Sequence, residues 1–170
     1  MQRFCLFTFI LICIAVVPVF AQSGPDLPQR TVTVQATQAL NFGDMTILSG
    51  SSGGTVSVDY NGSRSFTGSV VMLNMGNPVQ PAIFEVKICP GRMINVTFPA
   101  TTVLNGSNGG SMVLNLGPTS IGGSGSTFIS NKGCDDIHLI RVGGTLNVAN
   151  MGTNPAGLYT GSFSLTFVQQ

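Results

Sequence analysis

The chain has 170 residues, of which 43% are hydrophobic and only 8% are charged, and its formal net charge at pH 7 is +1. Its basic residues are scattered along the sequence, whereas a nucleic-acid surface needs a basic cluster that displaces counterions from phosphate. We therefore expect no nucleic-acid partner.

Residues 1–21 have the pattern of a secretory signal peptide. Arg3 precedes an apolar run over 4–17, and Val19-Phe20-Ala21 matches the small-x-small pattern of a cleavage site. The apolar run is too short for a membrane span, and no later run reaches about 18 residues. The sequence predicts cleavage after Ala21 and export to the periplasm, cell surface or extracellular space. It predicts no transmembrane segment in the mature chain.

After cleavage, residues 22–30 form a proline-containing extended lead-in, and residues 31–170 are predicted to form one β-sandwich domain. Apolar and polar residues alternate with a period of two, which places them on opposite faces of strands. No window has the apolar spacing of a helix over three turns. The predicted strands cover 31–36, 40–43, 46–48, 55–60, 63–66, 70–73, 82–89, 94–98, 112–116, the region of Phe128, 137–142, 144–148 and 157–170. Such short strands separated by turn signals indicate an antiparallel all-β sandwich.

Two local features of these strands are specific. Asn61-Gly62 predicts a two-residue type I′ hairpin, because both residue types tolerate positive φ. Over residues 157–170, small and apolar residues alternate with mostly hydroxylated ones. This alternation predicts one long strand, which must pair with a neighbouring strand. Its apolar face comprises Gly157, Tyr159, Gly161, Phe163, Leu165 and Phe167.

The mature chain keeps two cysteines, Cys89 and Cys134. An even pair in an exported protein predicts one disulfide, which would stabilise the fold by about 4 kcal/mol in the chain-entropy model. Two buried thiols are the alternative.

The polar residues predict no catalysis, no cofactor and no metal. His138 is the only histidine, and Ser52 lies in a G-x-S-x-G match at 50–54 that a strand rather than a helix follows. Cys134, Asp135, Asp136 and His138 are the densest group of ligand-type residues, but a zinc site needs about four convergent ligands. We expect a solvated loop there.

Several motifs resemble a family of exported, fimbria-like bacterial domains of unknown function. They are Leu40-Asn41-Phe42-Gly43, Gly53-Gly54-Thr55-Val56, Arg64 with Thr67-Gly68, Pro81-Ala82-x-Phe84, Gly109-Gly110-Ser111-Met112, Val142-Gly143-Gly144-Thr145-Leu146-Asn147-Val148 and Pro155-Ala156-Gly157-x-Tyr159-x-Gly161-x-Phe163. The resemblance implies an immunoglobulin-like β-sandwich and a surface or periplasmic location, and it supplies no catalytic residues.

The chain is also similar, more distantly, to chaperone–usher pilins. Gly157 and the apolar alternation after it match the last strand of pilins, whereas Gln169 stands where pilins have a penultimate aromatic residue. The similarity implies a periplasmic chaperone as a partner, and strand exchange with like subunits. Residues 31–36 are the candidate donor strand, with Val32, Val34 and Ala36 as its inserted side chains. The alternative is that they form the domain's own first strand.

These observations predict an exported structural or adhesive protein of the cell surface, for example a fimbrial-type subunit, with no catalytic activity. A carbohydrate- or surface-binding sandwich module is the alternative. For that role, Asn, Ser and Thr in the loops 49–54 and 117–126 would hydrogen-bond a sugar, although the chain has no Trp to stack on it.

Overall fold

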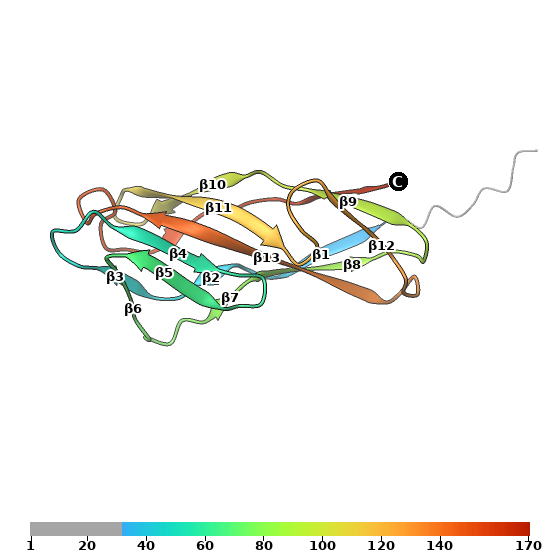
Figure 1. Ribbon diagram of the computed structural model, residues 1–170, viewed down its shortest axis with the longest axis horizontal. Coiled ribbons are helices and arrows are strands. Elements are labelled where there is room, and N and C mark those ends of the chain that lie inside the picture. Colours follow the sequence, from blue (N-terminus) through green and yellow to red (C-terminus); the bar gives the residue numbers. More distant parts are fainter. Residues whose placement is uncertain (1–31) are drawn as a thin grey trace, which may run out of the picture.

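The computed structural model describes residues 32–170, which form fifteen strands and no helix (Figure 1). The strands are β1 (Thr33–Gln38), β2 (Asn41–Phe42), β3 (Met45–Ile47), β4 (Gly54–Val58), β5 (Arg64–Gly68), β6 (Val70–Met72), β7 (Val79–Gln80), β8 (Ala82–Lys87), β9 (Met93–Thr97), β10 (Thr101–Gly106), β11 (Ser111–Thr119), β12 (Ser126–Ile129), β13 (Ile137–Val148), β14 (Tyr159–Thr160) and β15 (Thr166–Gln169). All the ladders between them are antiparallel, so the predicted all-β sandwich class is confirmed. The predicted signal peptide, the lead-in 22–30 and Thr31 lie outside the described residues. Within 32–170, no helix is long and apolar enough to span a membrane.

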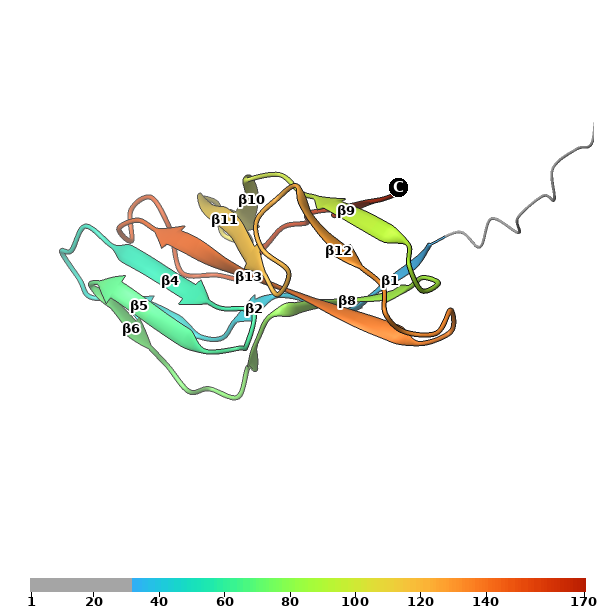
Figure 2. The same cartoon turned by 45° about the vertical axis from the view of Figure 1, so that its right-hand side comes forward.

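One large sheet, here called the long sheet, forms the first layer of the sandwich. Its order is β1-β8-β13-β11-β10-β14, and β4 and β5 attach to it through β13. The twelve-residue strand β13 spans its length: β8 lies along Ile137–Val142, and β4 lies along the rest of the same edge. Figures 1 and 2 show an elongated body with β13 running through its middle.

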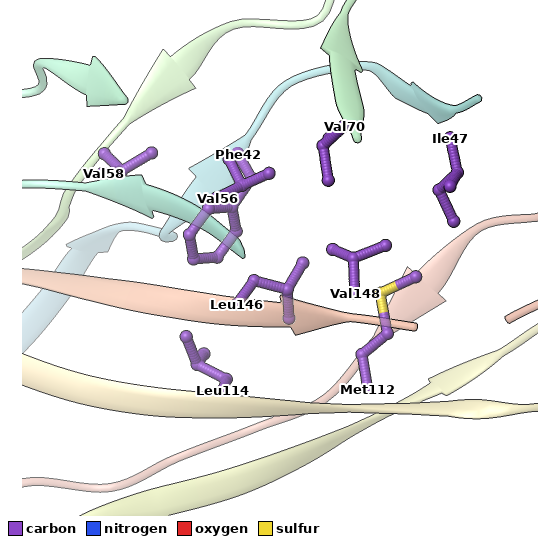
Figure 3. Packing of buried hydrophobic residues seen from close by; sticks show 9 residues of the cluster. All are labelled: Phe42, Ile47, Val56, Val58, Val70, Met112, Leu114, Leu146 and Val148. Carbon is purple, nitrogen blue, oxygen red and sulfur yellow. The ribbon is translucent and has the colours of Figure 1, made fainter. Parts of the chain in front are cut away.

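The second layer differs between the two ends of the long sheet. Over one end lies the three-stranded sheet β12-β9-β15, and over the other lie two separate ribbons, β2-β7 and β3-β6. Each end has its own hydrophobic core. The larger core consists of nine buried residues, shown in Figure 3: Phe42, Ile47, Val56, Val58, Val70, Met112, Leu114, Leu146 and Val148. The smaller core consists of Val86, Ile88, Ile94, Val96 and Ile140.

Strand β13 reaches both cores because its alternate residues keep facing inward over its whole length. Ile140 packs in the smaller core and Leu146 in the larger. The sequence predicted two strands here, divided at Gly143, and this division is wrong. A Cβ on Gly143 would contact the backbone oxygen of Val58, so glycine serves close packing of two strands here and not a turn.

The hairpin between β4 and β5 exists, but the predicted type I′ turn is wrong. Gly62 has φ of 90°, and no residue other than glycine has a positive φ in the described chain. The backbone N–H groups of Asn61 and Ser63 both donate to Oδ1 of Asp59, at 2.9 and 2.7 Å. This carboxylate favours a three-residue loop in which Gly62 alone takes the left-handed conformation.

The long terminal strand predicted over 157–170 is divided into β14 and β15. β14 pairs with β10 in the long sheet, and β15 pairs with β9 in the three-stranded sheet. The two partners are consecutive in the chain and meet at a corner that contains Pro99, which has no N–H to donate. Residues 161–165 cross this corner opposite residues 98–104, without forming a ladder of their own.

Candidate functional site

An open groove lies over the larger core, between the beginning and the end of the described chain. One wall is the N-terminal strip, defined here as residues 33–47 with β1, β2 and β3. The other is the terminal strip, defined as residues 157–169 with β14 and β15. The cavity between the larger-core parts of these strips has a volume of about 560 Å³. No ladder joins the two strips within residues 32–170.

The floor of the groove borders the larger core, whose residues there are buried. Its apolar side chains come from β10, β11 and β13: Leu104, Met112, Leu114, Leu146 and Val148. Figure 3 shows Met112, Leu114, Leu146 and Val148 pointing into one space, with Phe42 and Ile47 coming from the N-terminal strip. The cavity therefore opens directly into a hydrophobic core.

The terminal strip directs only half of its backbone groups to its partner strands. The N–H of Ser107 donates to the oxygen of Leu158, and the N–H of Gln170 donates to the oxygen of Met93. Between these bonds, the hydroxyl of Thr102 donates to the oxygen of Ser162 at 2.8 Å. Even-numbered residues thus face β10 and β9. Because backbone groups of successive residues in a strand point to opposite edges, the odd-numbered residues present theirs to the groove.

The N-terminal strip repeats this arrangement on the opposite wall. The oxygen of Asp44 accepts from the N–H of Leu73, and the N–H of Leu48 donates to the oxygen of Ser69. The backbone groups of Met45 and Ile47 therefore face away from β6, on the groove side. Two strand edges without ladder partners face each other across an apolar floor.

Asp44 places a carboxylate in the groove wall. Asn77 donates to its Oδ1 at 2.6 Å, but its Oδ2 is buried and has no hydrogen-bond partner among the described residues. A buried acceptor without a donor costs free energy. An occupant of the groove with an N–H group would remove this cost.

Exposed apolar side chains gather at the mouth of the groove. Met75, Met151 and Leu158 are 74%, 50% and 71% exposed, and all three line the groove. Exposed apolar residues gathered in one patch indicate an interaction surface, whereas scattered single ones do not.

Hydrogen bonds within the chain hold the terminal wall in place. Asn154 is buried, and its side chain accepts from the N–H of Ala149 and donates to the oxygen of Ser111, at 2.6 and 2.7 Å. The hydroxyl of Tyr159 donates to the oxygen of Pro155 at 2.8 Å. These bonds fix the corner between β13 and β14, so the groove does not depend on a loose segment.

The structure contains the predicted disulfide between Cys89 and Cys134. Of the six predicted residues of the terminal face, Gly157, Tyr159, Gly161 and Phe163 line the groove. Leu165 and Phe167 pack against the smaller core instead.

The candidate donor residues lie at the edge of the long sheet. Val34 and Ala36 are in β1, which pairs with β8 of the same chain, and Val32 packs against the smaller core. β1 has one ladder only, and Val34 is 37% exposed. Within the single chain, this segment forms a first strand of the domain itself.

His138 hydrogen-bonds through Nε2 to Oγ of Ser130 at 2.9 Å. Burial lowers the pKa of His138, and the charge of Lys132 lowers it further, while Asp136 opposes both. The pair resembles a base and a nucleophile, but Ser130 is only 2% exposed and its Oγ also contacts the oxygen of Ile88 at 3.2 Å. The geometry indicates a structural hydrogen bond near the disulfide. Among residues 32–170, no three side chains of His, Cys, Asp and Glu could hold a metal ion together.

The two loops of the carbohydrate-binding alternative lie over different ends of the sandwich. Loop 49–54 joins β3 to β4 beside the larger core. Loop 117–126 is bonded to the β9 region, where the N–H of Gly125 donates to the oxygen of Val96. The structure does not bring them together.

Sequence reasoning missed the groove itself, with Asp44 in its wall and Met75, Met151 and Leu158 at its mouth. A signal was present, because two of the motifs that carry the family resemblance form opposite walls. Residues 40–43 line one wall, and residues 155–157 with Tyr159, Gly161 and Phe163 line the other. Their separation in the chain concealed that they face each other.

A comparison with known protein families finds one family whose model matches nearly all of the described residues. The model of a domain of unknown function, DUF4402, matches residues 32–168. The chain belongs to this family. The match covers both cores, both walls of the groove and the disulfide. No curated protein and no solved structure matches the chain.

Proposed function

We propose that this DUF4402 protein is an exported structural or adhesive protein of the cell surface, a fimbrial-type subunit that assembles with like subunits. The observation that carries the proposal is the groove, in which two facing strand edges lie over an apolar floor. An exposed strand edge is a site for pairing with another chain, and most proteins protect such edges. Here two edges, an open core and a patch of exposed apolar residues coincide, which supports assembly through this site.

The other polar groups of the molecule give less support to a reaction or to sugar binding. The closest approach to a catalytic pair is Ser130 with His138, of which Ser130 is buried and neither lines the groove. The loops 49–54 and 117–126, on which a sugar-binding role would rest, cover different cores. Surface assembly is therefore the function that the geometry supports best.

The proposal is tested in cells that produce the full-length protein with its signal sequence. We expect the protein in the fraction sheared from intact cells, degraded by an added protease that leaves a periplasmic marker intact. Electron microscopy of the sheared fraction should show linear assemblies that an antibody to the protein labels. A variant that lacks residues 1–21 is the control and should stay inside the cell. Protein that is protected from the protease in intact cells and monomeric after release would contradict the proposal.

A further inference from the structure

The methionines of the described chain gather around the groove. Residues 32–170 contain six methionines, and four of them line the cavity of about 560 Å³: Met45, Met75, Met112 and Met151. Met72 packs against the larger core, and Met93 alone lies at the other end of the sandwich, in β9. Methionine is flexible and polarisable, and proteins use it on apolar surfaces that adapt to a partner.

Two of the four groove methionines are largely exposed. Met75, in the loop between β6 and β7, is 74% exposed, and Met151, in the turn after β13, is 50% exposed. Met112, on the floor of the groove, is only 7% exposed. A reagent dissolved in water therefore reaches the two methionines at the mouth before it reaches the one on the floor.

Thioethers are the accessible sulfur groups of the described chain. The two cysteines of residues 32–170 are joined in a disulfide, so neither offers a thiolate to an oxidant. A hydroperoxide reacts with methionine instead. The sulfur attacks one oxygen of hydrogen peroxide, the O–O bond breaks, and the products are methionine sulfoxide and water. The sulfur loses the two electrons that the peroxide gains.

Resting on the proposed function, we propose that Met75 and Met151 form an oxidation site at the mouth of the groove, and that their conversion to sulfoxides weakens assembly with like subunits. On a cell surface, hydroperoxides reach both side chains directly. A sulfoxide is polar, and burying its oxygen against an apolar neighbour without a hydrogen-bond donor costs free energy. The modification is reversible, because reductases specific for each sulfoxide epimer restore the thioether.

The positions of the two residues separate assembly from folding. Neither Met75 nor Met151 belongs to either hydrophobic core. The turn at Met151 is held by its backbone, since the N–H groups of Thr153 and Asn154 both donate to the oxygen of Asn150, at 3.1 and 2.8 Å. Oxidation of these two side chains therefore changes the surface that a neighbour meets and leaves the sandwich folded.

The order of oxidation tests the site itself. The mature chain, residues 22–170, is treated with limiting hydrogen peroxide, quenched with free methionine, and mapped by protease digestion and mass spectrometry. We expect sulfoxide on Met75 and Met151 well before Met112. In the urea-unfolded chain, which is the control, the three should react alike. Oxidation of Met112 as fast as Met75 in the folded protein would overturn the proposal.

Sedimentation of the same samples tests the effect on assembly. We expect oxidation to weaken self-association of the parent protein by more than about tenfold. The oxidised protein should keep its circular-dichroism spectrum. Unchanged association after oxidation would overturn the proposal, as would unfolding, which would place the effect in the cores.

Two variants assign the effect to the mouth of the groove. In the double variant Met75→Leu with Met151→Leu, side chains of similar volume replace the thioethers. Whatever its own association constant, this variant should keep that constant after oxidation. Met93→Leu, the matched control at the closed end, should lose association on oxidation as the parent protein does. Equal losses in the double variant and the parent protein would overturn the assignment.

Reduction tests whether the site is reversible. Reductases for both sulfoxide epimers, supplied with dithiothreitol, should restore association of the oxidised parent protein. Dithiothreitol alone is the control, because it also acts on the disulfide. If the enzymes remove the added oxygen atoms and association does not return, the proposal is wrong.

The parent protein separates this inference from the proposed function. If the oxidised parent protein assembles as the unoxidised one does, the oxidation site has no role in assembly and the proposed function stands. If the unoxidised parent protein stays monomeric and never reaches the surface, the proposed function is wrong. Rapid oxidation of Met75 and Met151 would then remain as a modification without control of assembly.

Discussion

The two ends of the sandwich use the same long sheet but complete it in different ways. At the end of the smaller core, β12, β9 and β15 form a continuous second layer, and the Cys89–Cys134 disulfide joins the chain after β8 to the loop before β13. At the end of the larger core, the second layer consists of two short ribbons, and the terminal strip stands apart from them. One end is closed by its own chain, and the other has an opening into its core.

This difference indicates separate roles for the two ends: stability for the closed end and association for the open end. The closed end can supply stability without a partner, because its layers are paired and covalently linked. The open end keeps apolar surface and strand edges for another chain. We therefore expect substitutions at the closed end to change the free energy of unfolding, and substitutions in the groove to change association.

The largest effect is expected from removing the disulfide. In the double variant Cys89→Ser with Cys134→Ser, the unfolded chain regains the freedom of a loop with a sequence separation of 45. The chain-entropy model predicts a loss of about 4 kcal/mol in the free energy of unfolding, measured by urea denaturation. At urea concentrations where the variant is still folded, self-association should be unchanged. Loss of association in the folded variant would show that the two ends are coupled.

Truncating the same residue type in the two cores compares them directly. Val96 is fully buried in the smaller core, and Val148 is 4% exposed at the floor of the groove. We expect Val96→Ala to cost about 2 to 3 kcal/mol, because a closed core cannot refill the space, and Val148→Ala about 1 kcal/mol, because its surroundings are already incompletely packed. Denaturant unfolding measures both values. Equal costs for the two variants would contradict the description of an incompletely packed core beside the groove.

Gly161 lies where the terminal strip crosses from one end to the other, and its substitution should have an intermediate effect. A Cβ there would lie 2.5 Å from the oxygen of Val103 and 2.6 Å from Cδ2 of Leu104. We expect Gly161→Ala to destabilise the fold by about 1 to 2 kcal/mol and to weaken self-association, because the strip must move away from β10. Gly123→Ala is the control, since a Cβ at Gly123 meets nothing within 4 Å. An unchanged Tm in Gly161→Ala would show that the close approach is not required.

Much of the fold could be predicted because the period of two is a local signal. Alternation located the strands that carry the buried residues of both cores, including the apolar faces of β8 and β11, but it did not locate β10, whose Leu104 packs against the larger core. The even cysteine count identified the disulfide. The errors arose where long-range contacts override local preference. Gly143 serves close strand packing within β13, Asp59 changes the Asn61–Gly62 turn, and the corner at Pro99 divides the terminal strand.

The groove could not be predicted for a related reason. Alternation shows which side chains of a strand face inward, but it does not show which strand lies beside it. The motifs at 40–43 and 155–163 both have small and apolar residues in strand-like order, and nothing in either sequence states that the other forms the opposite wall. Only the topology places them at facing edges without a ladder between them.

The smallest effect is expected at the closed end, where His138 joins β13 to Ser130. Burial and Lys132 lower the pKa of His138 in the folded protein, so the neutral ring is favoured there. The unfolded chain takes up the proton first as the pH falls below its ordinary value of 6.5, so the stabilisation present above that pH is lost on acidification. We expect a small decrease in Tm between pH 7.5 and pH 5.5, and a flatter dependence in His138→Gln, whose side chain does not titrate. A variant with the same decrease as the parent protein would assign the pH dependence to other groups. Self-association through the groove should not follow this titration, because His138 contacts Phe128 beside the smaller core and does not line the cavity.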